Sequence, residues 1–188
     1  MKIGVLLGGN SAEREVSLAS GKAISAACKD LGHDVVDLDP EFDMKLLVPD
    51  LLTVDLVFNG LHGGDGENGV IPGFLQSLGV KYTGSKTEAS AICMDKRISK
   101  ALVHRKNLLT PNWVSLDNND PLPSVGDMVF PIVIKPNDQG STIGLTVVKD
   151  ESELDNAIEL ARQFANVCLL YTSPSPRDLS TSRMPSSA

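Results

Sequence analysis

The stretch IGVLLGGNSAEREVS, residues 3–17, decides the fold of the first half of the chain. An apolar run is followed at once by two glycines and then by a segment with helical periodicity. This order is typical of the first strand, turn and helix of a βαβ unit. The pattern predicts a strand over residues 2–8 and a helix over residues 13–32, which Gly32 ends as a cap. The predicted buried stripe of this helix consists of Val16, Ala19, Ala23, Ala27 and Leu31.

The rest of the first half repeats this alternation of short apolar runs and amphipathic segments. Strands are expected over residues 34–39 (DVVDLD), 56–61 (LVFNGL) and 80–83, with a helix over residues 69–78. Strands that alternate with helices form a parallel sheet with the helices packed on its faces. The first half is therefore predicted to be a doubly wound, Rossmann-like α/β domain.

The pattern changes near Asp95, where we place a domain boundary. A basic helix starts here and stops before Pro111, and WVSL then restarts extended structure. The runs FPIVIKP and TIGLTVV, separated by the loop NDQGS, predict an antiparallel hairpin. Residues 151–166 form the last predicted helix, with an apolar face made by Leu154, Ile158 and Ala161.

The composition argues against several classes of function. The formal net charge of -7 leaves no basic stripe for nucleic acid. No apolar run reaches the roughly 18 residues that a membrane span needs. The N-terminal apolar run is too short for a signal peptide, so we expect a cytoplasmic protein. The cysteines have no CxxC spacing, so neither a zinc site nor a disulfide framework is predicted.

The last segment, CLLYTSPSPRDLSTSRMPSSA at residues 168–188, differs from the rest in composition. It is rich in Ser, Thr and Pro and shows no periodicity, which is typical of a disordered tail. The string also resembles the translation of a sequencing-library adapter. We therefore expect the natural sequence to stop near Val167, and we leave residues 168–188 out of the fold prediction.

The residues after the first glycine pair leave three interpretations open. A glycine turn before a helix can bind an anion, but GGNSAE lacks the GxGxxG spacing of a dinucleotide loop, although Asp37 or Asp39 could still bind a ribose. Asn10 and Glu13 could instead form a capping box. Alternatively, Glu13 at the carboxyl edge of the sheet could receive a cationic group such as a substrate ammonium.

A second motif, LHGGDGENG at residues 61–69, also follows a predicted strand. Its four glycines in nine residues cost backbone entropy, so the chain here needs a conformation that other residues do not adopt. His62 stands at the start of the motif, at the sheet edge where parallel α/β folds bind ligands. It is either a hydrogen-bonded structural residue or a residue of the site, and the pattern leaves both open.

A third group of residues lies in the second half. Gly140, Ser141 and Gly144 give the hairpin tip a flexible backbone rich in N–H donors, which could cover phosphates. Lys96 supplies a charge from the start of the basic helix, where a solvent-exposed lysine is the alternative. Solvation explains Lys135 less well, because it closes the apolar strand IVIK.

Taken together, four motifs resemble the D-alanine:D-alanine ligases of the ATP-grasp superfamily. The motifs are GVLLGGNSAEREVSLASG, LHGGDGENG, YTGSKTEASAICMDKRISK and IVIKPNDQGSTIG, in the order and at the spacing of that family. The resemblance extends over residues 1–167. It implies a Rossmann-like substrate-binding domain over residues 1–94 and the start of an α+β ATP-grasp domain over residues 95–167.

The resemblance also implies an activity. Such ligases join two D-alanines for peptidoglycan synthesis: ATP phosphorylates the carboxylate of the first, the amine of the second attacks the acyl phosphate, and phosphate leaves from a tetrahedral intermediate. By position, Glu13 resembles the acid that receives the first substrate's ammonium, and His62 the residue beside its carboxylate.

The second half of the chain would then bind ATP. Lys96 and Lys135 resemble the two phosphate-binding lysines of the family, which neutralise charge on the transferring group. Ser141 resembles the serine that hydrogen-bonds toward the acid and helps to close the active-site loop. The glycine-rich tip, with Gly140, would exclude water from the acyl phosphate.

The sequence departs from the family at two points. The acidic loop commonly reads GEDG, whereas residues 66–69 here read GENG. The family's C-terminal half, with the adenine pocket, the Mg²⁺-binding acids and an oxyanion-stabilising arginine, has no counterpart, so we assign no metal ligand and expect this chain alone to be inactive. D-lactate or D-serine as second substrate, a homodimer, and a non-catalytic Rossmann-like nucleotide-binding module all stay open.

Overall fold

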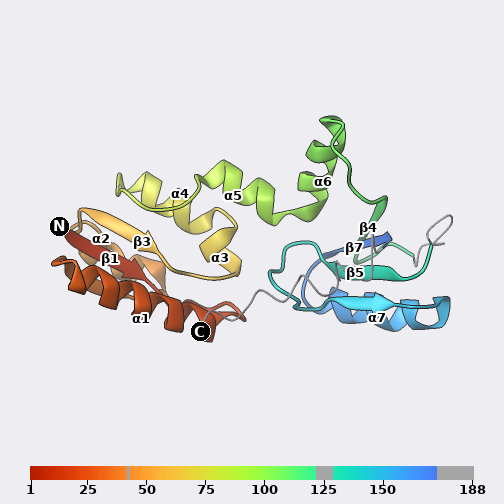
Figure 1. Ribbon diagram of the computed structural model, residues 1–188, viewed down its shortest axis with the longest axis horizontal. Coiled ribbons are helices and arrows are strands. Elements are labelled where there is room, and N and C mark those ends of the chain that lie inside the picture. The colour runs from red at the N-terminus through yellow and green to blue at the C-terminus, as the bar shows by residue number, and fades with distance from the viewer. Residues whose placement is uncertain (42, 122–128, 173–188) are drawn as a thin grey trace. The chain divides into compact units, whose positions relative to one another are not determined.

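The structure is a computed structural model that describes residues 1–41, 43–121 and 129–172 (Figure 1). The chain divides into two compact units, Met1–Cys93 and Met94–Ala188. The expected boundary, between residues 94 and 95, lies beside this division. Each unit has its own sheet and its own hydrophobic core. Among the described residues, no helix combines the length and the apolar character needed to cross a membrane.

The first unit contains a parallel three-stranded sheet in the order β2-β1-β3. Its strands are β1 (Lys2–Leu6), β2 (Asp34–Leu38) and β3 (Leu56–Asn59), and both neighbours run parallel to β1. The predicted strand at residues 80–83 is reduced to one parallel bridge between Val57 and Tyr82. The next amide of β3, that of Asn59, donates to the Thr83 hydroxyl at 3.1 Å and not to a backbone carbonyl, so the ladder does not continue.

Helices cover both faces of this sheet. The helical elements of the first unit are α1 (Arg14–Asp30), a 3-10 turn η1 (Met44–Leu47), α2 (Val48–Leu51), α3 (Gly64–Glu67), α4 (Val70–Ser77) and α5 (Thr87–Met94). Ile3, Val5 and Leu7 form the core on the α1 side. The larger core on the other face includes residues from α2 and α4, among them Leu51, Ile71 and Leu75. The doubly wound α/β fold predicted for the first half is therefore confirmed.

Helix α1 turns a different face toward the sheet than the sequence predicted. The expected buried stripe is exposed, at Val16, Ala19, Ala23, Ala27 and Leu31. The buried residues of the helix are instead Ser17, Gly21 and Ser25. A Cβ atom on Gly21 would lie 2.2 Å from Leu7 Cβ, so only a glycine fits at this approach of helix to strand. The prediction was wrong because this close approach selects small side chains at the centre of the contact, while the apolar residues Leu18, Ile24 and Cys28 pack beside it, partly buried.

The second unit contains an antiparallel four-stranded sheet in the order β4-β7-β5-β6. Its elements are α6 (Lys96–Arg105), β4 (Trp113–Asp117), β5 (Ile132–Pro136), β6 (Thr146–Val148), a 3-10 turn η2 (Glu151–Glu153), α7 (Leu154–Arg162) and β7 (Val167–Thr172). The predicted hairpin is confirmed as the antiparallel pair of β5 and β6. Its second strand is shorter than predicted, because the residues before Thr146 form turns.

Helix α7 packs on this sheet through the predicted face. Leu154, Ile158 and Ala161 are all buried, in one cluster with Ile132 and Ile134 of β5. The period of the apolar residues therefore identified the correct side of this helix.

The segment predicted to be a non-native tail begins inside an element of the sheet. Residues 168–172 belong to β7, which pairs with both β4 and β5, so the predicted start of disorder at residue 168 is wrong for this stretch. Residues 173–188 lie outside the described residues. Strands pair through backbone groups whatever their side chains are, so the strand does not show whether residues 168–172 are natural. The natural end of the sequence near Val167 stays a prediction.

Candidate functional site

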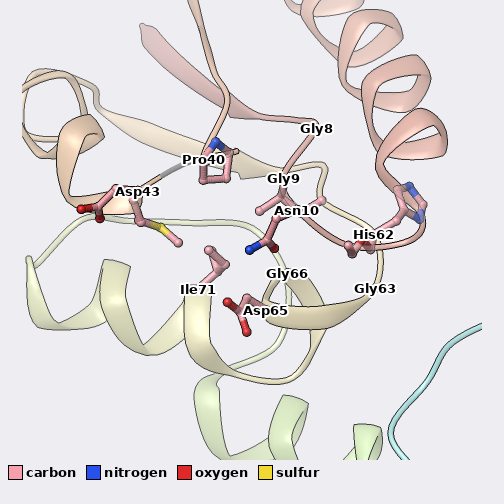
Figure 2. Close-up of a pocket in the computed structure, with 13 residues that line it drawn as sticks. Gly8, Gly9, Asn10, Pro40, Asp43, His62, Gly63, Asp65, Gly66 and Ile71 are labelled. Carbon is pink, nitrogen blue, oxygen red and sulfur yellow. The ribbon is translucent and has the colours of Figure 1, made fainter. Parts of the chain in front are cut away.

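A pocket of about 200 Å³ lies at the carboxyl ends of β1 and β3 in the first unit (Figure 2). Its walls come from the two glycine-rich motifs, including Gly8, Gly9, Asn10 and Ser11 after β1 and Leu61, His62, Gly63 and Gly66 after β3. In Figure 2 the side chains of Asn10 and Asp65 point toward the same space from different walls. Ligands of parallel α/β sheets bind at this edge.

Glu13 stands at the N-cap of α1, but its side chain makes no cap hydrogen bond. The Glu13 amide donates to Ser11 Oγ at 3.1 Å and not to Asn10, which rules out the alternative of a capping box between Asn10 and Glu13. The Glu13 carboxylate lies against Gly63, where an added Cβ would be 2.6 Å from Oε2. Gly63 has a φ of 65°, a conformation that favours glycine. Glu13 does not line the pocket itself and meets it through Gly63.

His62 lines the same pocket, but its ring is already engaged. Its Nε2 atom lies 3.1 Å from Ser20 Oγ on α1, and in Figure 2 the imidazole is turned toward that helix. The His62 carbonyl accepts a hydrogen bond of 2.6 Å from Ser11 Oγ. The residue is thus fixed at both its backbone and its side chain, as both interpretations of the sequence would allow.

The acids considered for ribose binding are occupied by protein groups. Asp39 accepts from Arg14 Nη2 at 2.8 Å and from the Gly9 amide at 3.0 Å. Asp37 accepts a hydrogen bond from the Ser25 hydroxyl. A dinucleotide fold needs a free carboxylate at the end of the second strand. These contacts weaken the interpretation of the first unit as a nucleotide-binding module.

The second unit brings Lys96 to the loop of the hairpin. Its Nζ donates to the carbonyls of Asn137 at 3.0 Å and Gln139 at 2.6 Å, and the buried Asn137 side chain accepts from the Arg97 amide at 2.8 Å. Burial and the nearby Lys135 lower the pKa of Lys96 to about 8. The start of α6 and the loop after β5 are therefore joined around one ammonium group.

Lys135 lies near the end of β5 and is partly buried. Burial lowers the pKa of Lys135. Within the described part of the chain, no ion pair joins the Lys96 or the Lys135 ammonium to a carboxylate. The nearby carboxylates of Asp138 and Asp95 offset the lowering of the Lys96 pKa only in part. Two partly desolvated cations that form no ion pair favour an anion as ligand.

The loop between β5 and β6 carries the other predicted phosphate-binding residues. Gly140 is partly buried, and its carbonyl accepts from the Ile143 amide at 3.4 Å. Ser141 is exposed, with a φ of 50°. A Cβ atom on Gly144 would lie 2.7 Å from Phe164 and 2.8 Å from Pro136. Gly144 is therefore held by packing, and the predicted flexibility does not extend to this position.

Comparisons with known proteins agree with these features. A family model described as "D-ala D-ala ligase C-terminus" matches residues 100–183. The D-alanine--D-alanine ligase of Synechococcus sp. (strain JA-2-3B'a(2-13)) is 42% identical over 171 residues, which are 88% of this chain and 53% of that protein. The enzyme of the same name from Aquifex aeolicus is 40% identical over 170 residues, or 89% of this chain and 57% of that protein.

Solved structures give the same result. The crystal structure of a D-alanine--D-alanine ligase from Bacillus anthracis superposes with a TM-score of 0.86 at 32% identity, over 93% of this chain and 58% of that one. A structure of that ligase complexed with ATP gives a TM-score of 0.84 over 93% and 59%. The chain belongs to the D-alanine:D-alanine ligase family. It spans about half the length of the curated relatives it matches.

The site residues predicted from the resemblance fall into two groups, one in each unit. Glu13 and His62 lie in the first unit, whereas Lys96, Lys135 and the loop with Gly140 and Ser141 lie in the second. Glu13 directly precedes α1 and Lys96 begins α6, whereas Lys135 lies in β5. Their roles stay predictions.

Sequence reasoning missed a third lysine of this ligase fold. Lys100 Nζ donates to Thr110 Oγ1 at 2.7 Å and to the Pro111 carbonyl at 3.2 Å. Burial and Lys135 both lower the pKa of Lys100. Lys96 and Lys100 are four residues apart on α6, so they share a helix face, and this spacing was the signal that could have found it.

The described residues do not provide a metal centre. No group of three or more His, Cys, Asp or Glu side chains within residues 1–41, 43–121 and 129–172 is arranged to hold a metal ion. The lysines of the second unit suit an anion, and the pocket of the first unit, lined by backbone groups and by Asn10, Asp43 and Asp65, suits a small polar molecule.

Proposed function

We propose that the complete protein containing this chain is an ATP-dependent ligase that joins two D-alanines through a D-alanyl phosphate. The observation that carries the proposal is the pair of partly buried lysines, Lys96 and Lys135, with no ion-pair partner in the described part of the chain. Desolvated cations of this kind are costly without an anion, and the triphosphate of ATP supplies one. The family match gives the substrates.

In this proposal the first unit binds the first D-alanine. Glu13 receives the ammonium group, since its carboxylate is not used as a helix cap and lies against Gly63 at the pocket. His62 stands beside the substrate carboxylate, with its ring oriented by Ser20. Fixing the carboxylate of D-alanine in one place allows it to attack the terminal phosphate with little loss of entropy in the transition state.

The second unit binds the phosphates. Lys96 and Lys135 neutralise charge that develops on the transferring phosphoryl group, and Gly140 and Ser141 cover it as part of the loop. Excluding water protects the acyl phosphate until the amine of the second D-alanine attacks its carbonyl carbon. That attack forms a tetrahedral intermediate, which releases phosphate and leaves the new amide bond.

Other parts of the proposal rest on the family alone. Mg²⁺ accompanies ATP in this superfamily, but the described residues do not fit a metal centre, so no step is assigned to a metal here. A cytoplasmic location and a homodimer of the complete protein belong to the same proposal. So does the choice of D-alanine over D-lactate or D-serine as second substrate.

The test is a ligase assay on the complete protein, recovered by following the reading frame of the source gene onward from Val167. With ATP and D-alanine, we expect phosphate release matched by equal amounts of D-alanyl-D-alanine, detected by mass spectrometry. L-alanine is the control and should give neither product. Phosphate release without dipeptide, or equal turnover with L-alanine, would contradict the proposal. D-lactate or D-serine offered with D-alanine then identifies the second substrate.

A further inference from the structure

An ion pair at the start of α1 holds the glycine turn that forms one wall of the pocket. Arg14 and Asp39 meet through two parallel contacts, Nη1 to Oδ1 at 3.1 Å and Nη2 to Oδ2 at 2.8 Å. The same two side chains also bind both polar backbone groups of Gly9. Its amide donates to Asp39 Oδ1 at 3.0 Å, and its carbonyl accepts from Arg14 Nη1 at 2.7 Å.

This arrangement differs from an ordinary surface salt bridge. Only about a third of each side chain is exposed, 27% for Arg14 and 31% for Asp39. Two-point contacts between arginine and a carboxylate are stronger and more directional than single ones. Burial disfavours the charged form of Asp39, yet the hydrogen bonds from Arg14 and the Gly9 amide outweigh it and lower the pKa of Asp39. Glu41 adds a second carboxylate 3.0 Å from Arg14.

The turn that the pair holds is an unusual backbone conformation. Gly8 and Gly9 both have positive φ, 77° and 75°. A Cβ atom on Gly8 would lie 2.6 Å from the carboxylate oxygens of Asp39, so backbone and side chain are in close contact. Consecutive glycines are flexible when unsupported, because they lose more entropy on ordering than other residues. Both glycines line the pocket, so its shape depends on this support.

We propose that Arg14 and Asp39 are positioning residues for the first amino-acid substrate. They fix the Gly8–Gly9 turn and, through Arg14 itself, the start of α1 where Glu13 stands. The inference rests on the proposed function for the identity of that substrate. Neither side chain needs to touch the substrate, since each acts through the Gly9 backbone. Loss of the pair should weaken amino-acid binding and leave ATP binding unchanged, because the phosphate-binding lysines lie in the other unit.

The first test measures the turn directly in the 188-residue chain by amide hydrogen exchange of Gly9. In Arg14→Gln and in the isosteric Asp39→Asn, the Gly9 amide should exchange at least about tenfold faster than in the wild type. Lys22→Gln, at an exposed position of the same helix, is the matched control and should leave the rate unchanged. Equal Gly9 exchange in the wild type and both pair variants overturns the inference. If Arg14→Gln fails to fold, Asp39→Asn tests the inference alone, because it preserves the shape of the side chain.

The second test measures catalysis in the complete ligase. Arg14→Gln should raise the KM for D-alanine about tenfold with the KM for ATP unchanged, and Arg14→Lys, which keeps the charge but loses the two-point contact, should lie between it and the wild type. An equal rise in both KM values, or a fall in kcat alone, overturns the inference. If the wild-type protein forms no dipeptide, the proposed function is wrong. The exchange rate of the Gly9 amide then tests, without any catalytic assay, whether Arg14 and Asp39 hold the turn.

Discussion

The pocket of the first unit and the lysine cluster of the second handle charge in opposite ways. Near the pocket, the guanidinium of Arg14 is paired with two carboxylates, Asp39 and Glu41. In the second unit, Lys96 and Lys100 donate to neutral oxygens, and Lys100 and Lys135 lie over the ring of Tyr171. Among the described residues, none of these three ammonium groups forms an ion pair. A paired charge shapes the backbone around it, whereas an unpaired one is available to a ligand.

The difference has an energetic consequence. The paired charges stabilise the turn that they hold, so removing one should loosen the pocket. Lys135 repels both Lys96 and Lys100, and all three lysines are partly desolvated, so folding holds them at a cost that a bound anion would relieve. Removing a charge should therefore lower stability near the pocket. In the lysine cluster, removing a charge should weaken anion binding without lowering stability.

The largest expected effect is on ATP use in the second unit. Lys135→Met in the complete ligase should lower kcat/KM for ATP by about 100-fold or more, because a charge that stabilises the transferring phosphate is lost. The KM for D-alanine should stay constant. Lys149→Met, an exposed lysine just after β6, is the matched control and should have no effect in the same steady-state assay. Equal losses in the two variants would show that the lysine is only a solvated charge.

A smaller effect is expected at the amino-acid pocket of the first unit. Glu13→Gln should raise the KM for D-alanine about 10- to 100-fold, as expected for loss of a charged hydrogen bond, with the KM for ATP unchanged. Glu15→Gln, the next acid on α1 and an exposed one, should leave both KM values unaltered. If Glu13→Gln lowers stability and leaves the KM for D-alanine alone, the carboxylate is structural.

Packing of the first unit can be tested without any substrate. Gly21→Ala should lower the free energy of unfolding by about 1–3 kcal/mol, because the new methyl group overlaps Leu7. Urea unfolding followed by circular dichroism measures it, with Lys22→Ala as the control on the exposed face. At an exposed helical site the change from glycine to alanine stabilises, so the sign of the effect decides whether the helix approaches β1 this closely.

The lysine cluster should also give a pH dependence. Because the pKa of Lys96 is about 8, the affinity for ATP should fall as pH rises through this value, since the Lys96 ammonium loses its charge. Stability should move the other way: between pH 8 and the ordinary lysine pKa of 10.5 the unfolded chain binds more protons, so the free energy of unfolding rises with pH. In Lys96→Met, two pH dependences should flatten across this range: that of ATP affinity, measured by calorimetric titration, and that of the free energy of unfolding, measured with urea.

The smallest expected effect tests which face of α1 is exposed to solvent. Ala23→Lys should change the free energy of unfolding by no more than about 0.5 kcal/mol, because this side of the helix faces solvent. The same urea experiment serves. A loss of several kcal/mol would mean that the apolar stripe expected from the sequence is buried after all.

Much of the architecture could be predicted because it depends on local order along the chain. The run from β1 through the glycine pair to α1, the parallel sheet, the hairpin of β5 and β6, and the buried face of α7 all follow from periodicity and turn chemistry. Lys135 was found in the same way, because a charged residue that closes an apolar strand is conspicuous in the sequence.

Contacts between distant segments could not be predicted. Which face of α1 is buried depends on how closely the helix approaches Leu7, and the pairing of Arg14 with Asp39 joins residues 25 positions apart. The sequence shows only the spacing of Lys100 from Lys96, and its nearness to Lys135 comes from the fold. Sequence by itself determined the order of the elements, since hydrophobic period and glycine positions are local properties. Only the tertiary structure decided which charges are paired and which are left for a ligand, because that depends on distances of a few ångströms between segments remote in the chain.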